Sequence, residues 1–212
     1  MKIIKGQSLD DATRAALASG RADPALALFI DSLMEMRGLS AIAAEAVSGA
    51  MLEAETLAEM SADALDRTFA AIEKGEGPQA PSAYPELIKV PPRLADAVRE
   101  AEARAGWRTR AAGIRGLLLD VGSEARVEVF RIEPGVASPR HTHKGNELTL
   151  CLHGGFSDER GAYGPGDVSI ADPSVNHQPR ADDDGVCFVL SVTDAGLKFD
   201  GLLGAIQKLS GG

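Results

Sequence analysis

The sequence predicts an α + β protein in which a small N-terminal helical bundle is followed by a C-terminal antiparallel β-barrel of the jelly-roll type. Residues 1–75 repeat apolar side chains at helical spacing, whereas residues from about 93 onward form short apolar runs separated by Gly, Pro and Asp. Residues 76–92 contain five prolines, which disfavour both helices and strand pairing. We therefore expect a helical domain at 1–75, a linker at 76–92 and a barrel domain at 93–212.

Start and stop signals divide the helical half into consecutive helices. Asp23 followed by Pro24 is a typical helix start, because the acid can cap the first N–H groups and proline suits the first turn. Gly38 ends that helix, and two further helices follow it. Bundles this small and rich in alanine are marginally stable alone and often bury a face against a partner. One apolar stripe is available for such a partner: Leu26, Phe29, Ile30, Leu33 and Met36.

Composition excludes several classes of function. The 212 residues carry a formal net charge of −9, which argues against nonspecific binding to nucleic acid or to an anionic membrane surface. No run approaches the roughly 20 apolar residues of a membrane span, and the first residues lack the apolar core of a signal peptide. The two cysteines, Cys151 and Cys187, fall in apolar strand-like runs, so we expect buried thiols and a cytoplasmic protein.

A metal-binding pattern begins at Gly135 and ends at Gly154. Between these glycines lie His141, His143 and Glu147. Two histidines one residue apart on an extended strand point to the same face, and Glu147 is far enough away to approach from an adjoining turn or strand. Neutral imidazoles and a carboxylate suit zinc, iron, manganese or nickel. We therefore predict one divalent metal ion in the barrel.

A fourth ligand should come from another strand, and His177 is the candidate. It follows a turn, Gly164-Pro165-Gly166-Asp167, and a short apolar run. A single histidine is more often a hydrogen-bonded structural residue than a ligand, but three of the four histidines in the chain fall in this pattern. We interpret the fourth, His153, as lying outside the pocket, and Tyr163 as a rim residue or a packing residue.

The spacing of the two glycines, two histidines and Glu147 resembles the first cupin motif. The second motif is matched less well, because Val175 stands where a glycine is usual and no Asn follows His177 at the customary spacing. The cupin resemblance covers roughly residues 110–195. It implies that the barrel is a cupin, a double-stranded β-helix of the jelly-roll type.

The similarity extends to the ChrR-like anti-sigma factors, in which a helical anti-sigma domain precedes a cupin. The order of helices, linker and barrel agrees, so the resemblance covers most of the chain. It is carried by Leu94-Ala95-Asp96, Trp107-Arg108-Thr109, His141 to Leu150, Gly166-Asp167, Ile170-Ala171-Asp172, His177, Thr193-Asp194-Ala195, Leu197 and Phe199.

This resemblance implies a function for each half. The helical domain would bind an extracytoplasmic-function sigma factor and keep it from RNA polymerase. The cupin metal, zinc by resemblance, would serve the response to a signal such as singlet oxygen. The ligands carried over by position are His141, His143, Glu147 and His177.

The helical half departs from the family in one respect. Family members usually hold a second zinc ion there with a histidine and a His-x3-Cys-x2-Cys run, whereas the matching stretch here contains Asp31, Glu35 and Gly38. No His or Cys occurs before position 141. A zinc site of that kind is therefore excluded, and the helical domain either folds by packing alone or no longer binds a sigma factor.

Three functions fit these observations. The first is a transcriptional regulator of the anti-sigma type, whose cupin senses an oxidative or small-molecule signal. The alternative is a metal-dependent cupin enzyme, a dioxygenase, isomerase or lyase, because an open coordination position can activate water or bind oxygen. The third is a metal-stabilised binding module that forms a homodimer through the apolar run at 186–192.

Overall fold

The structure is a computed structural model, and it describes residues 22–38, 84–194 and 197–199. Two α-helices, one 3-10 helix and eleven strands occur within these ranges. In chain order they are α2 (Pro24–Met36), η1 (Pro85–Lys89), α5 (Pro92–Arg104), β1 (Arg108–Ala111), β2 (Ile114–Leu119), β3 (Arg126–Ile132), β4 (His141–His143), β5 (Glu147–His153), β6 (Phe156–Asp158), β7 (Gly161–Tyr163), β8 (Val168–Ala171), β9 (Arg180–Ala181), β10 (Cys187–Thr193) and β11 (Leu197–Phe199).

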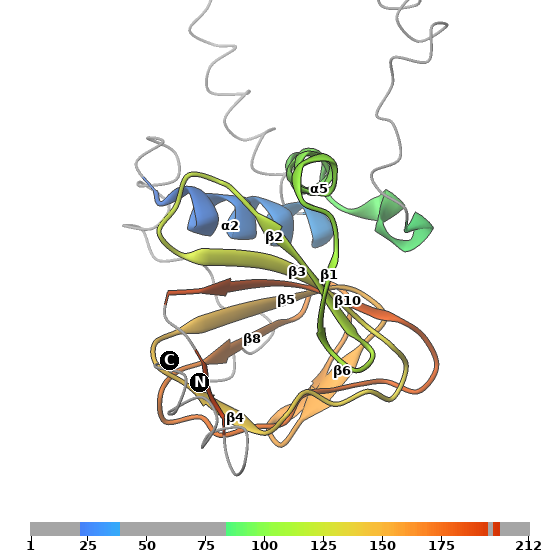
Figure 1. Ribbon diagram of the computed structural model, residues 1–212, viewed down its shortest axis with the longest axis vertical. Coiled ribbons are helices and arrows are strands. Elements are labelled where there is room, and N and C mark those ends of the chain that lie inside the picture. The colour runs from blue at the N-terminus through green and yellow to red at the C-terminus, as the bar shows by residue number, and fades with distance from the viewer. Residues whose placement is uncertain (1–21, 39–83, 195–196, 200–212) are drawn as a thin grey trace, which may run out of the picture.

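The strands form an antiparallel double-layered barrel. The largest sheet has six strands in the order β1-β2-β3-β10-β5-β8, and two smaller sheets have the orders β11-β4 and β7-β6-β9. In Figure 1, helices α2 and α5 lie over one face of the six-stranded sheet, whereas β4 and β6 lie beyond its other face. The barrel interior is therefore enclosed between the six-stranded sheet and the two smaller ones.

The β prediction is confirmed, because the structure has a cupin-like β-sandwich in the C-terminal half. The expected strands at 114–121, 126–132, 147–152, 168–170 and 186–192 correspond to β2, β3, β5, β8 and β10. A helical bundle is not shown. Of the helices expected in residues 1–75, only α2 lies in the described part of the chain, and the others fall on residues 1–21 and 39–83, outside it. Within the described residues, no helix is long and apolar enough to cross a membrane.

Helix α2 begins where the sequence predicts. The carboxylate of Asp23 accepts a hydrogen bond from the backbone N–H of Ala25 at 2.9 Å, and Pro24 occupies the first turn. Gly38, with a φ of +66°, follows the end of the helix. The apolar stripe is not free for a partner over its whole length, which corrects that expectation: Phe29 and Ile30 are only 3% and 5% exposed, whereas Leu26, Leu33 and Met36 are partly buried. Phe29 and Ile30 are buried in a core that α2 shares with β5, β10 and α5.

The two faces of the six-stranded sheet have different surroundings. Side chains on the outer face, such as Val129, Leu150 and Leu190, pack with the helices in one hydrophobic core. Alternate residues point into the barrel, as expected from the period of two along a strand. Of these, Glu128, Ser191 and Thr193 are buried polar residues. The sheet therefore separates the apolar core under the helices from a barrel interior that holds these polar residues together with a second, smaller apolar cluster.

We predict that Phe29→Ala lowers the free energy of unfolding by about 3–5 kcal/mol, because it empties the contact between α2 and the sheet. Chemical denaturation of the full chain measures the change. Leu118→Ala is the matched control: Leu118 is 42% exposed, and its truncation should cost no more than about 0.5 kcal/mol. A Phe29→Ala variant as stable as the control would show that α2 does not contribute to this core.

Candidate metal centre

The structure brings the four sequence-predicted residues together. His141 and His143 lie on β4, separated by one residue, and both point inward, at 5% and 0% exposed. Glu147 is the first residue of β5, beside Thr193 and Ala171 on the neighbouring strands. His177 forms an isolated bridge with His141, in which each backbone N–H donates to the other's carbonyl at 3.0 Å. One potential ligand atom from each residue lies within 4.8 Å of the others.

The three imidazole rings present the same nitrogen to a common point. Nε2 of His177 lies 3.0 Å from Nε2 of His143 and 3.2 Å from Nε2 of His141. Nδ1 of His141 lies 2.7 Å from the carbonyl oxygen of Pro139, which can only accept a hydrogen bond. Nδ1 of His141 therefore carries the proton, and its Nε2 lone pair faces the cluster.

This arrangement fits a divalent metal ion. Tetrahedral zinc with Zn–N bonds of about 2.0–2.1 Å separates its ligand nitrogens by about 3.3–3.4 Å, close to the spacing in the cluster. Without a cation, lone pairs that converge in a buried space would repel one another. Glu147 can supply a carboxylate oxygen: its Oε1 accepts a hydrogen bond from Ser191 at 2.7 Å, and its Oε2 lies 3.6 Å from Nδ1 of His143. The cupin domain therefore contains a His/Glu cluster that could hold a metal ion.

A buried ion pair orients His177. Oδ2 of Asp158 lies 2.9 Å from Nδ1 of His177, and the Asp158 side chain is completely buried. Arg160 donates to the same carboxylate through Nε at 3.0 Å and Nη2 at 2.7 Å. The guanidinium also donates to the hydroxyl of Ser169 at 2.6 Å and to the carbonyl of Ile170. A carboxylate on Nδ1 fixes the tautomer that presents Nε2 to a metal ion.

The sequence did not indicate that Asp158 and Arg160 belong to the site. Asp158 is nineteen residues before His177 in the chain, and it reaches the histidine only because β6 pairs with β9. No spacing rule covers such a contact, and an Asp-x-Arg triplet is too common to signal it.

Burial holds two of the cluster histidines, His143 and His177, in the neutral form. It lowers the pKa of His143 from 6.5 to about 4, although the nearby Glu147 carboxylate opposes the shift. Burial likewise lowers the pKa of His177, although the hydrogen bond that its Nδ1–H donates to Asp158 opposes the shift. Burial alone would raise the pKa of Asp158, but hydrogen bonds with His177 and Arg160 outweigh it and hold that pKa below its ordinary value. At neutral pH, His143 and His177 are therefore neutral, which is the form of imidazole that binds metal, and Asp158 is ionised.

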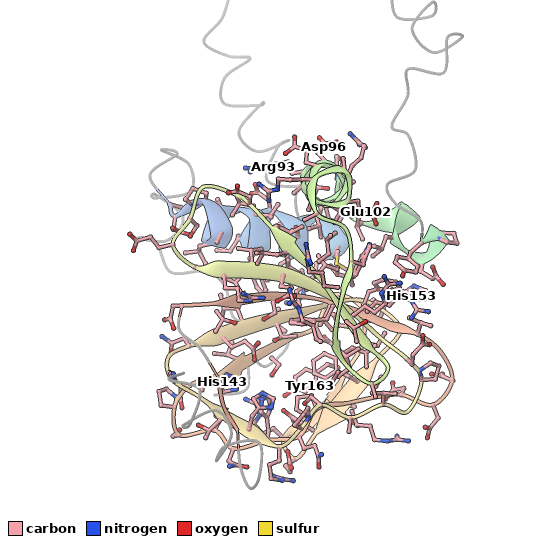
Figure 2. The ribbon with its side chains drawn as sticks, in the orientation of Figure 1. Arg93, Asp96, Glu102, His143, His153 and Tyr163 are labelled. Carbon is pink, nitrogen blue, oxygen red and sulfur yellow. The ribbon has the colours of Figure 1, made fainter. Side chains whose placement is uncertain are left out.

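The remaining candidates lie outside the cluster. His153 is exposed and lies beside Phe188, and Figure 2 shows it far from His143. Tyr163 is buried and stacks on Phe156, with ring centroids 4.7 Å apart, and burial raises its pKa. Cys151 and Cys187 are buried free thiols, as the sequence predicted. A hydrogen bond with Cys187, reinforced by burial, raises the pKa of Cys151, so this thiol stays protonated.

Antiparallel sheets that enclose three histidines and a glutamate define a cupin domain of the kind that can hold a metal ion. The pattern of the ChrR cupin-like domain matches residues 96–194. The anti-sigma-E factor ChrR of Cereibacter sphaeroides is 34% identical over 198 residues, which are 92% of each chain. The chain therefore belongs to the ChrR family.

A solved structure gives the same relationship. In the crystal structure of Rhodobacter sphaeroides SigE in complex with the anti-sigma ChrR, the matched chain is 32% identical to this one, with a TM-score of 0.58. The match covers 89% of this chain and 99% of that chain. It therefore extends beyond the cupin into the helical half.

We predict that Asp158→Ala weakens zinc binding by about 10–100-fold, because His177 loses the carboxylate that fixes its tautomer and orientation. Competition with a chromophoric chelator measures the affinity. Asp120→Ala, which removes an exposed carboxylate paired with Arg104 away from the cluster, should leave it unchanged. Unaltered zinc affinity in a folded Asp158→Ala variant would show that Asp158 does not support metal binding through His177.

We predict that the metal-free protein becomes less stable as the pH falls from about 6.5 to about 4. In that window the unfolded chain protonates His143, whereas the folded chain resists protonation until about pH 4. The resulting loss for His143 is about 3 kcal/mol, and His177 adds a loss of the same sign. Urea denaturation at several pH values measures it.

Two variants make this pH test specific. His143→Gln should flatten the pH dependence, and His153→Gln, which changes the exposed histidine, should not. Constant or rising stability on acidification of the metal-free protein would contradict the assignment of buried neutral imidazoles.

Proposed function

We propose that this chain is an anti-sigma factor whose helical half binds an extracytoplasmic-function sigma factor and whose cupin responds to an oxidative or small-molecule signal. One observation carries the proposal: the similarity to anti-sigma-E factor ChrR spans 92% of both chains and is not confined to the cupin. The solved SigE–ChrR complex supports the same class of partner. Because such a partner acts on RNA polymerase, we also propose that the chain works in the cytoplasm.

The metal centre of the proposed sensor is formed by His141, His143, Glu147 and His177. We propose zinc as the ion, since a tetrahedral set of imidazole and carboxylate ligands suits it, although iron, manganese and nickel accept the same donors. When bound, the ion would supply an electrophilic centre in the barrel. The division into a helical domain at 1–75, a linker at 76–92 and a cupin at 93–212 remains part of this proposal.

The proposal also explains how the helical half could work without its own zinc. Helix α2 packs on β5 and β10, and its C-cap residue, Arg37, donates to the carbonyl of Gly166 at 2.8 Å. Asp31 and Glu35 stand where zinc ligands are usual, so no ion stabilises this helix. The cupin sheet provides a hydrophobic surface on which the helix packs instead. Packing on the cupin takes over the stabilising role of the missing ion.

The same contact offers a route from the metal centre to the helical half. Strand β5 carries Glu147 on its inner face and Leu150 in the core under α2, and β10 carries Ser191 and Leu190 in the same way. A change of ligand at the metal that shifts Glu147 would therefore displace the surface on which α2 rests. We propose this strand pair as the link between signal and sigma binding.

The test is co-purification of the full chain with extracytoplasmic-function sigma factors of its host, followed by titration calorimetry. We predict a 1:1 complex that singlet oxygen, generated by an illuminated dye, weakens. Glu147→Gln should keep the complex but lose the response, because the signal acts through the metal. Asp120→Ala should keep both. Absence of a complex with every candidate sigma factor would falsify the proposal.

A second candidate is a metal-dependent cupin enzyme. The observation that favours it is a cavity of about 200 Å³ that borders His141, Glu147 and His177. Turnover of a small molecule by the metal-loaded chain, lost in Glu147→Gln and unaffected by sigma factors, would select this reading instead.

A further inference from the structure

The cavity beside the cluster is a candidate ligand site. Its volume is about 200 Å³, smaller than the roughly 300–1,000 Å³ of pockets for drug-sized molecules. Of the four cluster residues, His141, Glu147 and His177 line it, whereas His143 is completely buried and does not. A metal ion held by the four residues would therefore be reached from the cavity.

The wall beyond the cluster is apolar. It is formed mainly by side chains of β3, β6 and β10 that point into the barrel: Phe130, Ile132, Phe156 and Val189. Two arginines also line the cavity, but each is engaged by a carboxylate. Arg110 donates to Glu128 at 2.5 Å, and Arg180 pairs with Asp183. A polar molecule would lose hydrogen bonds to water against this wall, so the body of a ligand must be hydrocarbon.

One polar group beside the cluster has no partner. The hydroxyl groups of Ser191 and Ser169 are used, the first in a hydrogen bond to Glu147 and the second in one from Arg160. Thr149 lies between them, paired with Ser191 on β10 and Ser169 on β8, and it also lines the cavity. Its hydroxyl makes no hydrogen bond to any residue in the described part of the chain. It is therefore free to donate to a ligand.

The charge of the metal-loaded cluster determines which ligand head group fits. Three neutral imidazoles and one carboxylate around a divalent ion leave one positive charge, which a monoanionic oxygen donor neutralises in a space with little water. A carboxylate has two oxygens, one for the ion and one for the Thr149 hydroxyl. The cavity volume equals roughly seven water volumes of about 30 Å³ each, which limits the hydrocarbon body to a single ring or a short branched chain.

We infer that the cavity binds a small apolar monocarboxylate, with its carboxylate at the metal ion and Thr149 and its hydrocarbon body against Phe130, Ile132, Phe156 and Val189. The inference deepens the proposed function, on which it rests, because it names the chemical class of a small-molecule signal for the same cupin. Benzoate and 3-methylbutanoate have the required size and charge.

The test is titration calorimetry of the zinc-loaded full chain with benzoate. We expect saturable 1:1 binding. Acetate, which has the head group without the body, and benzyl alcohol, which has the body without the charge, should each bind at least about 10-fold more weakly. Cobalt(II) in place of zinc supplies a second readout, because benzoate should change its visible absorption as a ligand is added.

Two variants separate the named contacts from general effects. Thr149→Val keeps the shape of the side chain and should weaken benzoate binding about 10-fold by removing one hydrogen bond to a charged group. Thr109→Val, an exposed position on edge strand β1, should have no effect. Folding and zinc content of both variants are checked by circular dichroism and metal analysis.

Three outcomes would overturn the inference: no saturable benzoate binding, acetate binding as tightly as benzoate, or no effect of Thr149→Val in a folded, zinc-loaded protein. The sigma factor complex is measured separately. Benzoate binding by a chain that forms no sigma complex supports the ligand site and defeats the regulatory function. A chain that forms the sigma complex but does not bind benzoate supports the regulatory function and overturns the ligand site.

Discussion

Nε2 of His177 lies 3.0 Å from Nε2 of His143 and 3.2 Å from Nε2 of His141 in the barrel interior, and much of the structure serves to keep these nitrogens together. Each ring must present a lone pair to the same point, and for two of the three rings a hydrogen bond at the other nitrogen fixes that orientation. The carbonyl of Pro139 serves His141 and the carboxylate of Asp158 serves His177. A buried carboxylate needs a cation in turn, which Arg160 supplies while it also ties β6 to β8.

The six-stranded sheet connects the histidine cluster inside the barrel to the helices outside it. Because side chains alternate along each strand, β5 and β10 present polar groups to the candidate metal centre and Leu150 and Leu190 to the core under α2 and α5. The helices are therefore part of the hydrophobic core on which the barrel depends. Phe29 on α2 is only 3% exposed, so α2 is an integral part of this core. One set of strands thus serves both the candidate sensor and the helical half.

The sequence could predict the parts of the site that depend on local spacing. His141 and His143 share a face because they are two residues apart on a strand, and the Asp23 cap marks the start of α2. Asp158, by contrast, reaches its histidine only through pairing between β6 and β9, which no spacing reveals. The stripe on α2 likewise showed that one face is buried, but an amphipathic pattern does not say against what. The sequence suggested a partner, whereas the structure places the cupin sheet there.

The most direct test of this account is the X-ray absorption spectrum of the zinc-loaded chain at the metal edge. The account predicts one ion per chain with nitrogen and oxygen neighbours at about 2.0–2.2 Å, multiple scattering from three imidazoles and no sulfur. A sulfur shell at about 2.3 Å would place the ion on Cys151 and Cys187 instead. That result, or fewer imidazoles than three, would contradict a centre made by His141, His143, Glu147 and His177.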